Sequence, residues 1–235
     1  MAIKALTFDT GGTILDWHGG ISGAFARIGA AHAIERDWPA IANDYRRRAL
    51  KRMLNAGGER PASFNIDDVH CEVLDAMLAE HGLQAFTADD RRTLWRTWHE
   101  LRAWPDFPAV LPKLRERYVV ASFTILSVAL IVDTARRNKL SFDAVLSCEM
   151  IGAYKVRPKA YRTAAKWLAL PPAEILMVAC HNFDLDAARA AGFNTAFVRR
   201  PAEWGPEGPP DPEPNPACTI VAADFPDLAR QLGVV

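Results

Sequence analysis

Four residues with reactive side chains stand at or just beyond the ends of apolar runs in the sequence: Asp9, Ser122, Lys155 and Asp184. Carboxylates, a hydroxyl and an ammonium group can perform nucleophilic and acid–base chemistry. Taken singly, each has an ordinary structural role, as a turn former or helix cap for the aspartates, a buried hydroxyl for the serine and a solvated charge for the lysine. Their recurrence at successive runs favours one shared site.

The apolar runs alternate with segments of helical periodicity. This alternation predicts an α/β fold, a doubly wound, mostly parallel Rossmann-like sheet with helices on both faces. Ligands bind such sheets at the carboxyl ends of the strands, where the four residues stand. Residues 201–216 hold 7 of the 16 prolines, which predicts an extended surface loop. Strands are expected at 3–8, 118–123, 144–148, 174–180, 195–198 and 219–222, and helices at 128–138, 158–170, 184–192 and 223–232.

The stretch between the first strand and the rest of the sheet contains no convincing strand. Its apolar residues recur at helical spacing in four segments, with Asp37 and Thr87 at expected N-cap positions and a loop expected at residues 55–61. We therefore expect a helical cap domain, residues 17–106, inserted after the first strand. The α/β core domain would comprise residues 1–16 and 107–235.

Four motifs of the chain resemble those of the haloacid dehalogenase superfamily of hydrolases. They are FDTGGT (8–13), Ser122 after VVA, Lys155 in AYKVRPKAY, and Asp184, the first aspartate in MVACHNFDLDAARAAGF. The resemblance implies that Asp9 is a nucleophile that forms a covalent ester with the substrate. It also implies that Ser122 hydrogen-bonds the nucleophile or substrate, that Lys155 keeps Asp9 ionised, and that Asp184 orients or activates the hydrolytic water.

Two groups typical of the Mg²⁺-dependent phosphatases in this superfamily are missing. Gly11 stands where they carry a second aspartate, and Cys180 stands where they place an acidic metal ligand. Mg²⁺ prefers oxygen ligands, so Cys is a poor substitute. A halide leaves without a general acid, which favours the metal-free branch, the type II (S)-2-haloacid dehalogenases. We expect no metal or cofactor, with Mg²⁺ implied only by the phosphatase alternative.

The resemblance to this branch also implies residues that bind the substrate. Arg46, in DYRRRALKRML (44–54), matches the arginine that binds the substrate carboxylate, although a solvated helix face is the structural alternative. Thr10, Gly11, Phe123, Thr124, His181 and Asn182 complete the expected substrate-binding set.

The chain also departs from the type II pattern. Gly11 replaces an aromatic residue, Phe123 an asparagine and Val156 a proline, while Ala179-Cys180-His181 replaces Ser-Ser-Asn. The segment after Ser122 is slightly longer than usual, so Thr124 or Ser127 could be the functional hydroxyl instead.

These observations predict hydrolytic dehalogenation of small 2-haloalkanoic acids to 2-hydroxy acids, with the substrate as the only small-molecule partner. A Mg²⁺-dependent phosphatase and a catalytically silent member of the same superfamily remain the alternatives. The retained Asp9, Lys155 and Asp184 argue against the silent member.

Composition limits the remaining classes of partner and location. The 235 residues carry 28 Lys and Arg against 28 Asp and Glu, so a nucleic-acid partner is not expected. Neither a membrane segment nor a signal peptide is expected. The four cysteines form no CxxC pair, which favours reduced thiols and a cytoplasmic location. The resemblance suggests a possible homodimer, to which Trp95, Trp98 and Trp104 could contribute, although core packing is the commoner role of such residues.

Overall fold

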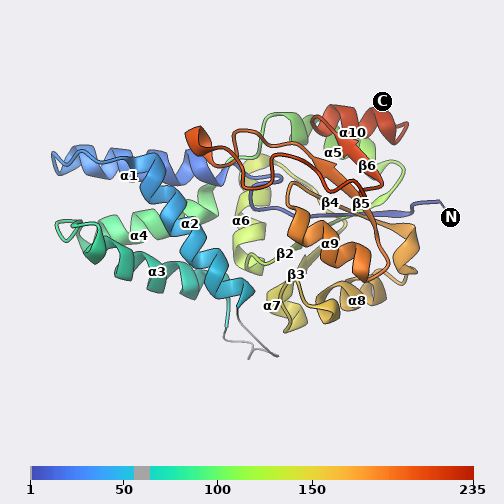
Figure 1. The fold of residues 1–235 in the computed structure, drawn as a ribbon, viewed down its shortest axis with the longest axis horizontal. Helices are drawn as coiled ribbons and strands as arrows, with labels where there is room; N and C mark the ends of the chain where they lie inside the picture. Colours follow the sequence, from blue (N-terminus) through green and yellow to red (C-terminus); the bar gives the residue numbers. More distant parts are fainter. Residues whose placement is uncertain (1, 56–63) are drawn as a thin grey trace.

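The computed structural model describes residues 2–55 and 64–235. Its centre is a parallel six-stranded sheet in the order β3-β2-β1-β4-β5-β6 (Figure 1). The central strand β1 and its neighbour β4 are buried along their whole length, as expected of parallel strands covered on both faces. The predicted α/β sheet is confirmed. The strands are β1 (Ala5–Phe8), β2 (Val119–Thr124), β3 (Ala144–Ser147), β4 (Ile175–Ala179), β5 (Asn194–Val198) and β6 (Ile220–Ala222).

Helices cover both faces of the sheet (Figure 1). Phe8 of β1 packs against Phe107 and Phe225 of the helices on one face, with ring centroids 5.4 and 5.9 Å apart. Phe123 of β2 packs against Tyr161 on the opposite face, at 5.2 Å. The flanking helices are α5 (Asp106–Arg115), α6 (Val128–Asn138), α7 (Cys148–Ile151), α8 (Pro158–Trp167), α9 (Asn182–Ala190) and α10 (Phe225–Gln231), with short 3-10 helices at Thr97–Glu100, Pro172–Glu174 and Gly205–Glu207.

Four helices between β1 and α5 pack against one another beside the sheet (Figure 1). They are α1 (Trp17–Ala31), α2 (Trp38–Leu54), α3 (Ile66–Glu80) and α4 (Ala88–Arg96). Asp37 caps α2 by accepting from the Ala40 amide, and Thr87 begins α4 in a capping box with Asp90, which confirms both expected N-caps. The loop expected at 55–61 lies, apart from Asn55, outside the described residues. The division into core and cap domains stays a prediction.

The helix α5 was not predicted. It contains Pro112 in its interior and Pro108 in its first turn, and prolines normally mark the end of a helical pattern. Its apolar residues nevertheless fill one face of the sheet, with Phe107 and Leu114 fully buried. In the described part of the chain no helix is long and apolar enough to cross a membrane.

The prediction that residues 201–216 form a surface loop is wrong for its first part. Glu203 and Trp204 are 1 % and 5 % exposed. The Trp204 ring packs edge-on against Trp17 of α1 at 4.9 Å. A proline-rich composition predicts an extended backbone, but it does not tell whether the chain crosses the surface or an interior junction. Here the loop joins the sheet to the α1–α4 helices.

Candidate active site

Asp9 lies immediately after β1, at the start of a tight turn. The Thr10 carbonyl accepts from the amides of Ile14 and Leu15, which closes the turn and holds Asp9 at the strand end. Gly12 has a φ of +96°, a conformation that favours glycine, and a Cβ there would lie 2.0 Å from Glu203 Oε1. The double glycine therefore serves both the turn and the close approach of the 201–216 loop.

Three donors converge on the Asp9 carboxylate. Lys155 Nζ is 3.1 Å from Oδ1, while Thr13 Oγ1 donates to Oδ2 at 2.8 Å and His181 Nδ1 lies 3.3 Å from the same oxygen. Burial alone would raise the pKa of Asp9, but Lys155, His181 and Thr13 together hold it well below its usual range. Asp9 is therefore ionised at neutral pH, which is the state that a carboxylate nucleophile requires.

Lys155 bridges the two predicted aspartates. Its Nζ is 2.6 Å from Asp184 Oδ2, and it lies 4.7 Å from the centroid of the Phe123 ring. Burial lowers the pKa of Lys155, but the charges of Asp184 and Asp9 outweigh burial and raise it. The second Asp184 oxygen, Oδ1, accepts from the Tyr161 hydroxyl at 2.6 Å. Both oxygens of Asp184 are thus engaged: Oδ2 contacts Lys155, and Oδ1 is held by Tyr161.

Arg46 enters the same site from α2. It is 2 % exposed, and its guanidinium carbon lies 5.6 Å from the centroids of the Trp17 and Trp98 rings. Nη2 contacts the Gly11 carbonyl at 3.5 Å, whereas Nε and Nη1 have no hydrogen-bond partner among the described residues. A buried cation with unpaired donors fits an anionic ligand, because a bound carboxylate would satisfy them.

A third carboxylate, which the sequence did not identify, completes the site. Glu203 Oε1 lies 2.9 Å from His181 Nε2 and accepts from Trp17 Nε1 at 3.1 Å, while the Cys180 thiol lies 3.5 Å from Oε2. Burial alone lowers the pKa of His181, but its partners raise it well above its ordinary value. Burial raises the pKa of Cys180 to about 11, so the anions beside His181 at neutral pH are Glu203 and Asp9.

The three candidate hydroxyls occupy different places. Thr124 ends β2, and its Oγ1 is hydrogen-bonded to Thr10 Oγ1 at 2.6 Å, one residue from Asp9. Ser122 pairs in register with Phe8, is fully buried, and its hydroxyl has no hydrogen-bond partner among the residues described. Ser127 caps α6 and donates to Asp67 at 2.6 Å. We call the side chains gathered around the Asp9 carboxylate the Asp9 cluster. Of the three candidate hydroxyls, Thr124 is the one linked to this cluster, through Thr10.

Of the other predicted substrate-binding residues, some lie in this cluster and some lie outside it. A Cβ on Gly11 would lie 3.1 Å from the Arg46 guanidinium, so this glycine leaves room for the arginine. Asn182 points elsewhere, because its side chain donates to the Glu213 carbonyl and accepts from the Asn215 amide. Asn182 therefore anchors the 201–216 loop.

Thr13, Tyr161 and Glu203 are site residues that the sequence analysis missed, although Thr13 lies within the FDTGGT motif. Tyr161 lies on α8, in the AYKVRPKAY motif that also carries Lys155. Its position on the buried face of that helix is a signal that could have identified it. Glu203 had no such signal, because it lies outside all four motifs.

The donor atoms do not suit Mg²⁺. In the parts of the chain that the structure describes, one group of side chains has the spacing of a metal site: Cys180, His181 and Glu203. Its sulfur and nitrogen are ligands that Mg²⁺ avoids, and its imidazole is already hydrogen-bonded to its carboxylate. Beside Asp9, position 11 offers no side-chain oxygen. Oxygen ligands for the phosphatase alternative would have to come from Asp9, a backbone carbonyl and Asp184, and Lys155 Nζ lies in contact with both of these carboxylates.

Comparison with known proteins agrees with this geometry. The family model for haloacid dehalogenase-like hydrolases matches residues 3–192. The chain belongs to the haloacid dehalogenase-like hydrolases. Within this family it is 31 % identical over 209 residues to (S)-2-haloacid dehalogenase 1 of Pseudomonas sp. (strain CBS-3), which covers 84 % of this chain and 85 % of that protein.

Two further relatives of this haloacid dehalogenase-like hydrolase carry similar names. (S)-2-haloacid dehalogenase 4A of Burkholderia cepacia is 27 % identical over 207 residues, covering 85 % of this chain and 84 % of that protein. The crystal structure of the defluorinating L-2-haloacid dehalogenase Rha0230 superposes with a TM-score of 0.89 at 34 % identity, covering 98 % of this chain and 95 % of that one.

Proposed function

We propose that this hydrolase removes a halide from small 2-haloalkanoic acids, giving 2-hydroxy acids, through an ester on Asp9 and without a metal. The observation that carries the proposal is the buried guanidinium of Arg46, with unpaired donors, in the same site as an ionised aspartate. A substrate with one carboxylate and one displaceable group next to it fits that pair. The printed names of the relatives favour the same chemistry.

In the first step, an Asp9 oxygen attacks the carbon that bears the halogen, and the halide leaves with the electron pair of the broken bond. Arg46 binds the substrate carboxylate, which positions that carbon beside the nucleophile. Lys155 and Thr13 hold the Asp9 carboxylate, so its orientation is fixed before the substrate arrives. Asp184 and Tyr161 act through Lys155 as positioning residues. We assign the hydroxyl role to Thr124.

In the second step, water hydrolyses the ester and releases the 2-hydroxy acid. Bulk water must be excluded in the first step, and the α1–α4 helices with the 3-10 helix that follows them, which carry Trp17, Arg46 and Trp98, provide that cover. We propose that these helices are the cap domain. The cytoplasmic location and the homodimer stay predictions, although Trp98 itself is buried inside the chain at 1 % exposure.

Halide release from a panel of fluoro-, chloro- and bromo-substituted 2-haloacids in EDTA tests the proposal, with Asp9→Asn as the matched control. We expect halide from the natural chain and none from the variant. Phosphate release that depends on added Mg²⁺, without halide release, would support the phosphatase instead. Binding of 2-hydroxy acids with no turnover of any substrate would support a silent member.

A further inference from the structure

His181 lies between two carboxylates, and the steps described above give it no role. We infer that His181, oriented by Glu203, is the base that activates water for hydrolysis of the Asp9 ester. The inference rests on the proposed ester chemistry. Both residues are at least 95 % buried, and their side chains form a continuous line from Glu203 through the imidazole to the nucleophile.

The carboxylate of Glu203 selects the useful form of the imidazole. It accepts a hydrogen bond from Nε2 at 2.9 Å, so the neutral ring keeps its proton on Nε2 and presents the lone pair of Nδ1. Nδ1 faces the Asp9 carboxylate at 3.3 Å. A water molecule attacking the ester carbonyl of Asp9 would therefore meet the basic nitrogen. Carboxylate–imidazole pairs in hydrolases orient their base in the same way.

Asp184, the residue that the sequence assigned to water, is occupied elsewhere. One oxygen is 2.6 Å from Lys155 Nζ and the other accepts from the Tyr161 hydroxyl at 2.6 Å. Activation of water by Asp184 would use a carboxylate whose two oxygens already accept these bonds in a fully buried site. The imidazole of His181 is placed differently: among the described residues its Nδ1 contacts Asp9, the group that the reaction converts to an ester.

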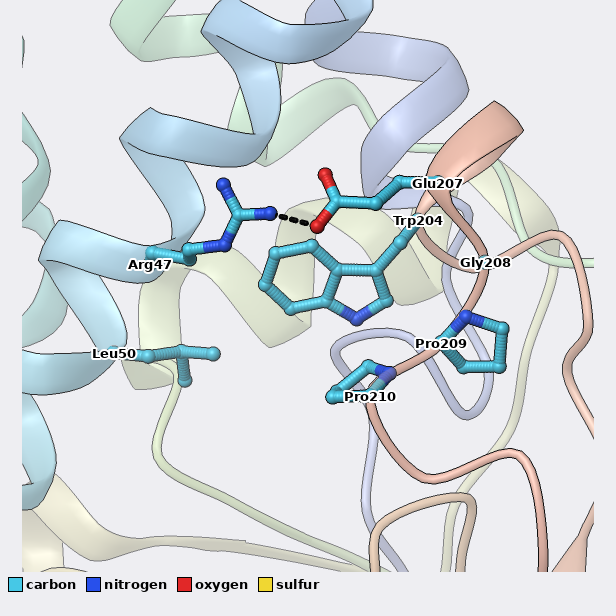
Figure 2. Close-up of a pocket in the computed structure, with 7 residues that line it drawn as sticks. All are labelled: Arg47, Leu50, Trp204, Glu207, Gly208, Pro209 and Pro210. Carbon is cyan, nitrogen blue, oxygen red and sulfur yellow. Dashed lines mark hydrogen bonds and ion pairs between the residues drawn. The ribbon is translucent and has the colours of Figure 1, made fainter.

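Glu203 is held firmly enough to orient the imidazole. Trp17 Nε1 donates to it at 3.1 Å, and the next residue, Trp204, accepts from Asn43 of α2 through its carbonyl at 3.2 Å. Figure 2 shows Glu207 of the same loop paired with Arg47, which also belongs to α2. These contacts tie the Glu203 loop to the helix that carries Arg46. They border a hollow of about 520 Å³ that is lined by residues of α2 and of the 201–216 loop.

Ester formation changes the charge around His181. In the free enzyme its anionic neighbours are Asp9 and Glu203, and Cys180 is a neutral thiol. The cation Lys155 contacts Asp9, and the cation Arg46 interacts electrostatically with Glu203. The imidazole is then protonated. Alkylation neutralises Asp9, so the imidazolium loses one of its two anions and releases its proton to solvent more readily. The base becomes available when the ester has formed.

The hydrolytic step then balances. Neutral His181 takes a proton from water through Nδ1 as the water oxygen bonds to Cγ of the Asp9 ester. The bond between Cγ and the Asp9 oxygen that attacked the substrate breaks, and that oxygen, now bonded to the substrate carbon, takes the proton back from His181 to form the 2-hydroxy acid. Asp9, released as a carboxylic acid, loses its proton to solvent.

His181→Gln and Glu203→Gln test the inference in rapid-quench reactions with chloroacetate, followed by mass analysis of the peptide that contains Asp9. We expect each variant to release about one halide per active site, to accumulate the adduct on Asp9, and then to turn over about 100-fold or more slowly than the natural chain. Imidazole added to a His181→Gly variant should speed loss of the adduct. His32→Gln, a partly buried histidine paired with Asp90 in the helical layer, is the matched control.

Three outcomes separate failure of the inference from failure of the proposed function. Parallel loss of halide burst and turnover in His181→Gln, with no adduct, would show that His181 serves the first step, for example by stabilising the leaving halide. Adduct accumulation in Asp184→Asn but not in His181→Gln would assign the base to Asp184. Either result overturns the inference alone. Halide release by Asp9→Asn at the natural rate would overturn the proposed ester chemistry itself.

Discussion

Replacing Arg46 with Met should weaken substrate binding while leaving the stability of the folded protein nearly unchanged. The guanidinium disappears, while a flexible apolar side chain of similar length remains between Trp17 and Trp98. The substrate carboxylate then lacks its charged partner in a buried site. Truncating one member of a buried, hydrogen-bonded charge pair costs about 2–5 kcal/mol. At about 1.36 kcal/mol per factor of ten, kcat/KM for halide release should fall about 30- to 5,000-fold.

The same change should have little effect on the stability of the free protein. Two guanidinium nitrogens of Arg46 have no hydrogen-bond partner among the described residues, and an unsatisfied buried group costs about 1–3 kcal/mol. The two ring contacts that are lost contribute about 0.5–2 kcal/mol each. These terms nearly offset, so the free energy of unfolding in urea should stay within about 1 kcal/mol of the natural value.

Steady-state halide release and urea unfolding of the same preparations measure both effects. Arg48→Met is the matched control, since Arg48 lies on the same helix but pairs with Asp44 and Glu80 at the surface, and it should keep kcat/KM unchanged. A loss of kcat/KM below tenfold in Arg46→Met would refute the assignment. So would destabilisation by about 3–5 kcal/mol, the cost of breaking a buried ion pair, because Arg46 would then be a structural counter-ion.

Three further changes test the rest of the site. Lys155→Met leaves Asp9 and Asp184 without their shared cation, so urea unfolding should show a loss of about 3–5 kcal/mol and halide release should stop; a stable, active variant would contradict this. Tyr161→Phe removes one hydrogen bond to Asp184 and should cost about 1.5–3 kcal/mol in the same assay, whereas unchanged stability would show that the hydroxyl is not needed there. The pKa of His181 is raised in the folded state, so its stabilising charge is complete below about pH 6.5 and is lost as the pH rises through the folded value; His181→Gln should therefore be more destabilising at pH 6 than at pH 9, and an equal effect at both would contradict the paired imidazolium.

The sheet and the core of the site could be predicted because their residues are local to their strands. Asp9 follows β1 directly, and Lys155 and Asp184 come a few residues after the ends of β3 and β4, so the strand pattern placed all three at one edge of the sheet. The sequence could not decide which of Ser122, Thr124 and Ser127 supplies the functional hydroxyl. The choice depends on where β2 ends, and the strand continues to Thr124, two residues beyond Ser122. A shift of two residues retains the sheet face but moves the hydroxyl along it.

Glu203 could not be predicted, for a different reason. Its role depends on a long-range approach between a proline-rich loop and the turn after β1, which only the glycine at position 12 permits. Local periodicity contains no information about such an approach. The helix α5 was missed for the opposite reason, because a local signal, Pro112, was outweighed by tertiary burial of the apolar face.

The central claim is that Asp9 forms a covalent bond to the substrate. A single turnover of a 2-haloacid in ¹⁸O-labelled water, with enzyme in excess, tests it most directly. The account predicts that the label enters the Asp9 carboxylate, detected in its peptide, and that the 2-hydroxy acid carries an unlabelled oxygen taken from Asp9. Label in the product and none in the Asp9 peptide would show that water displaces the halide directly, and would contradict the account.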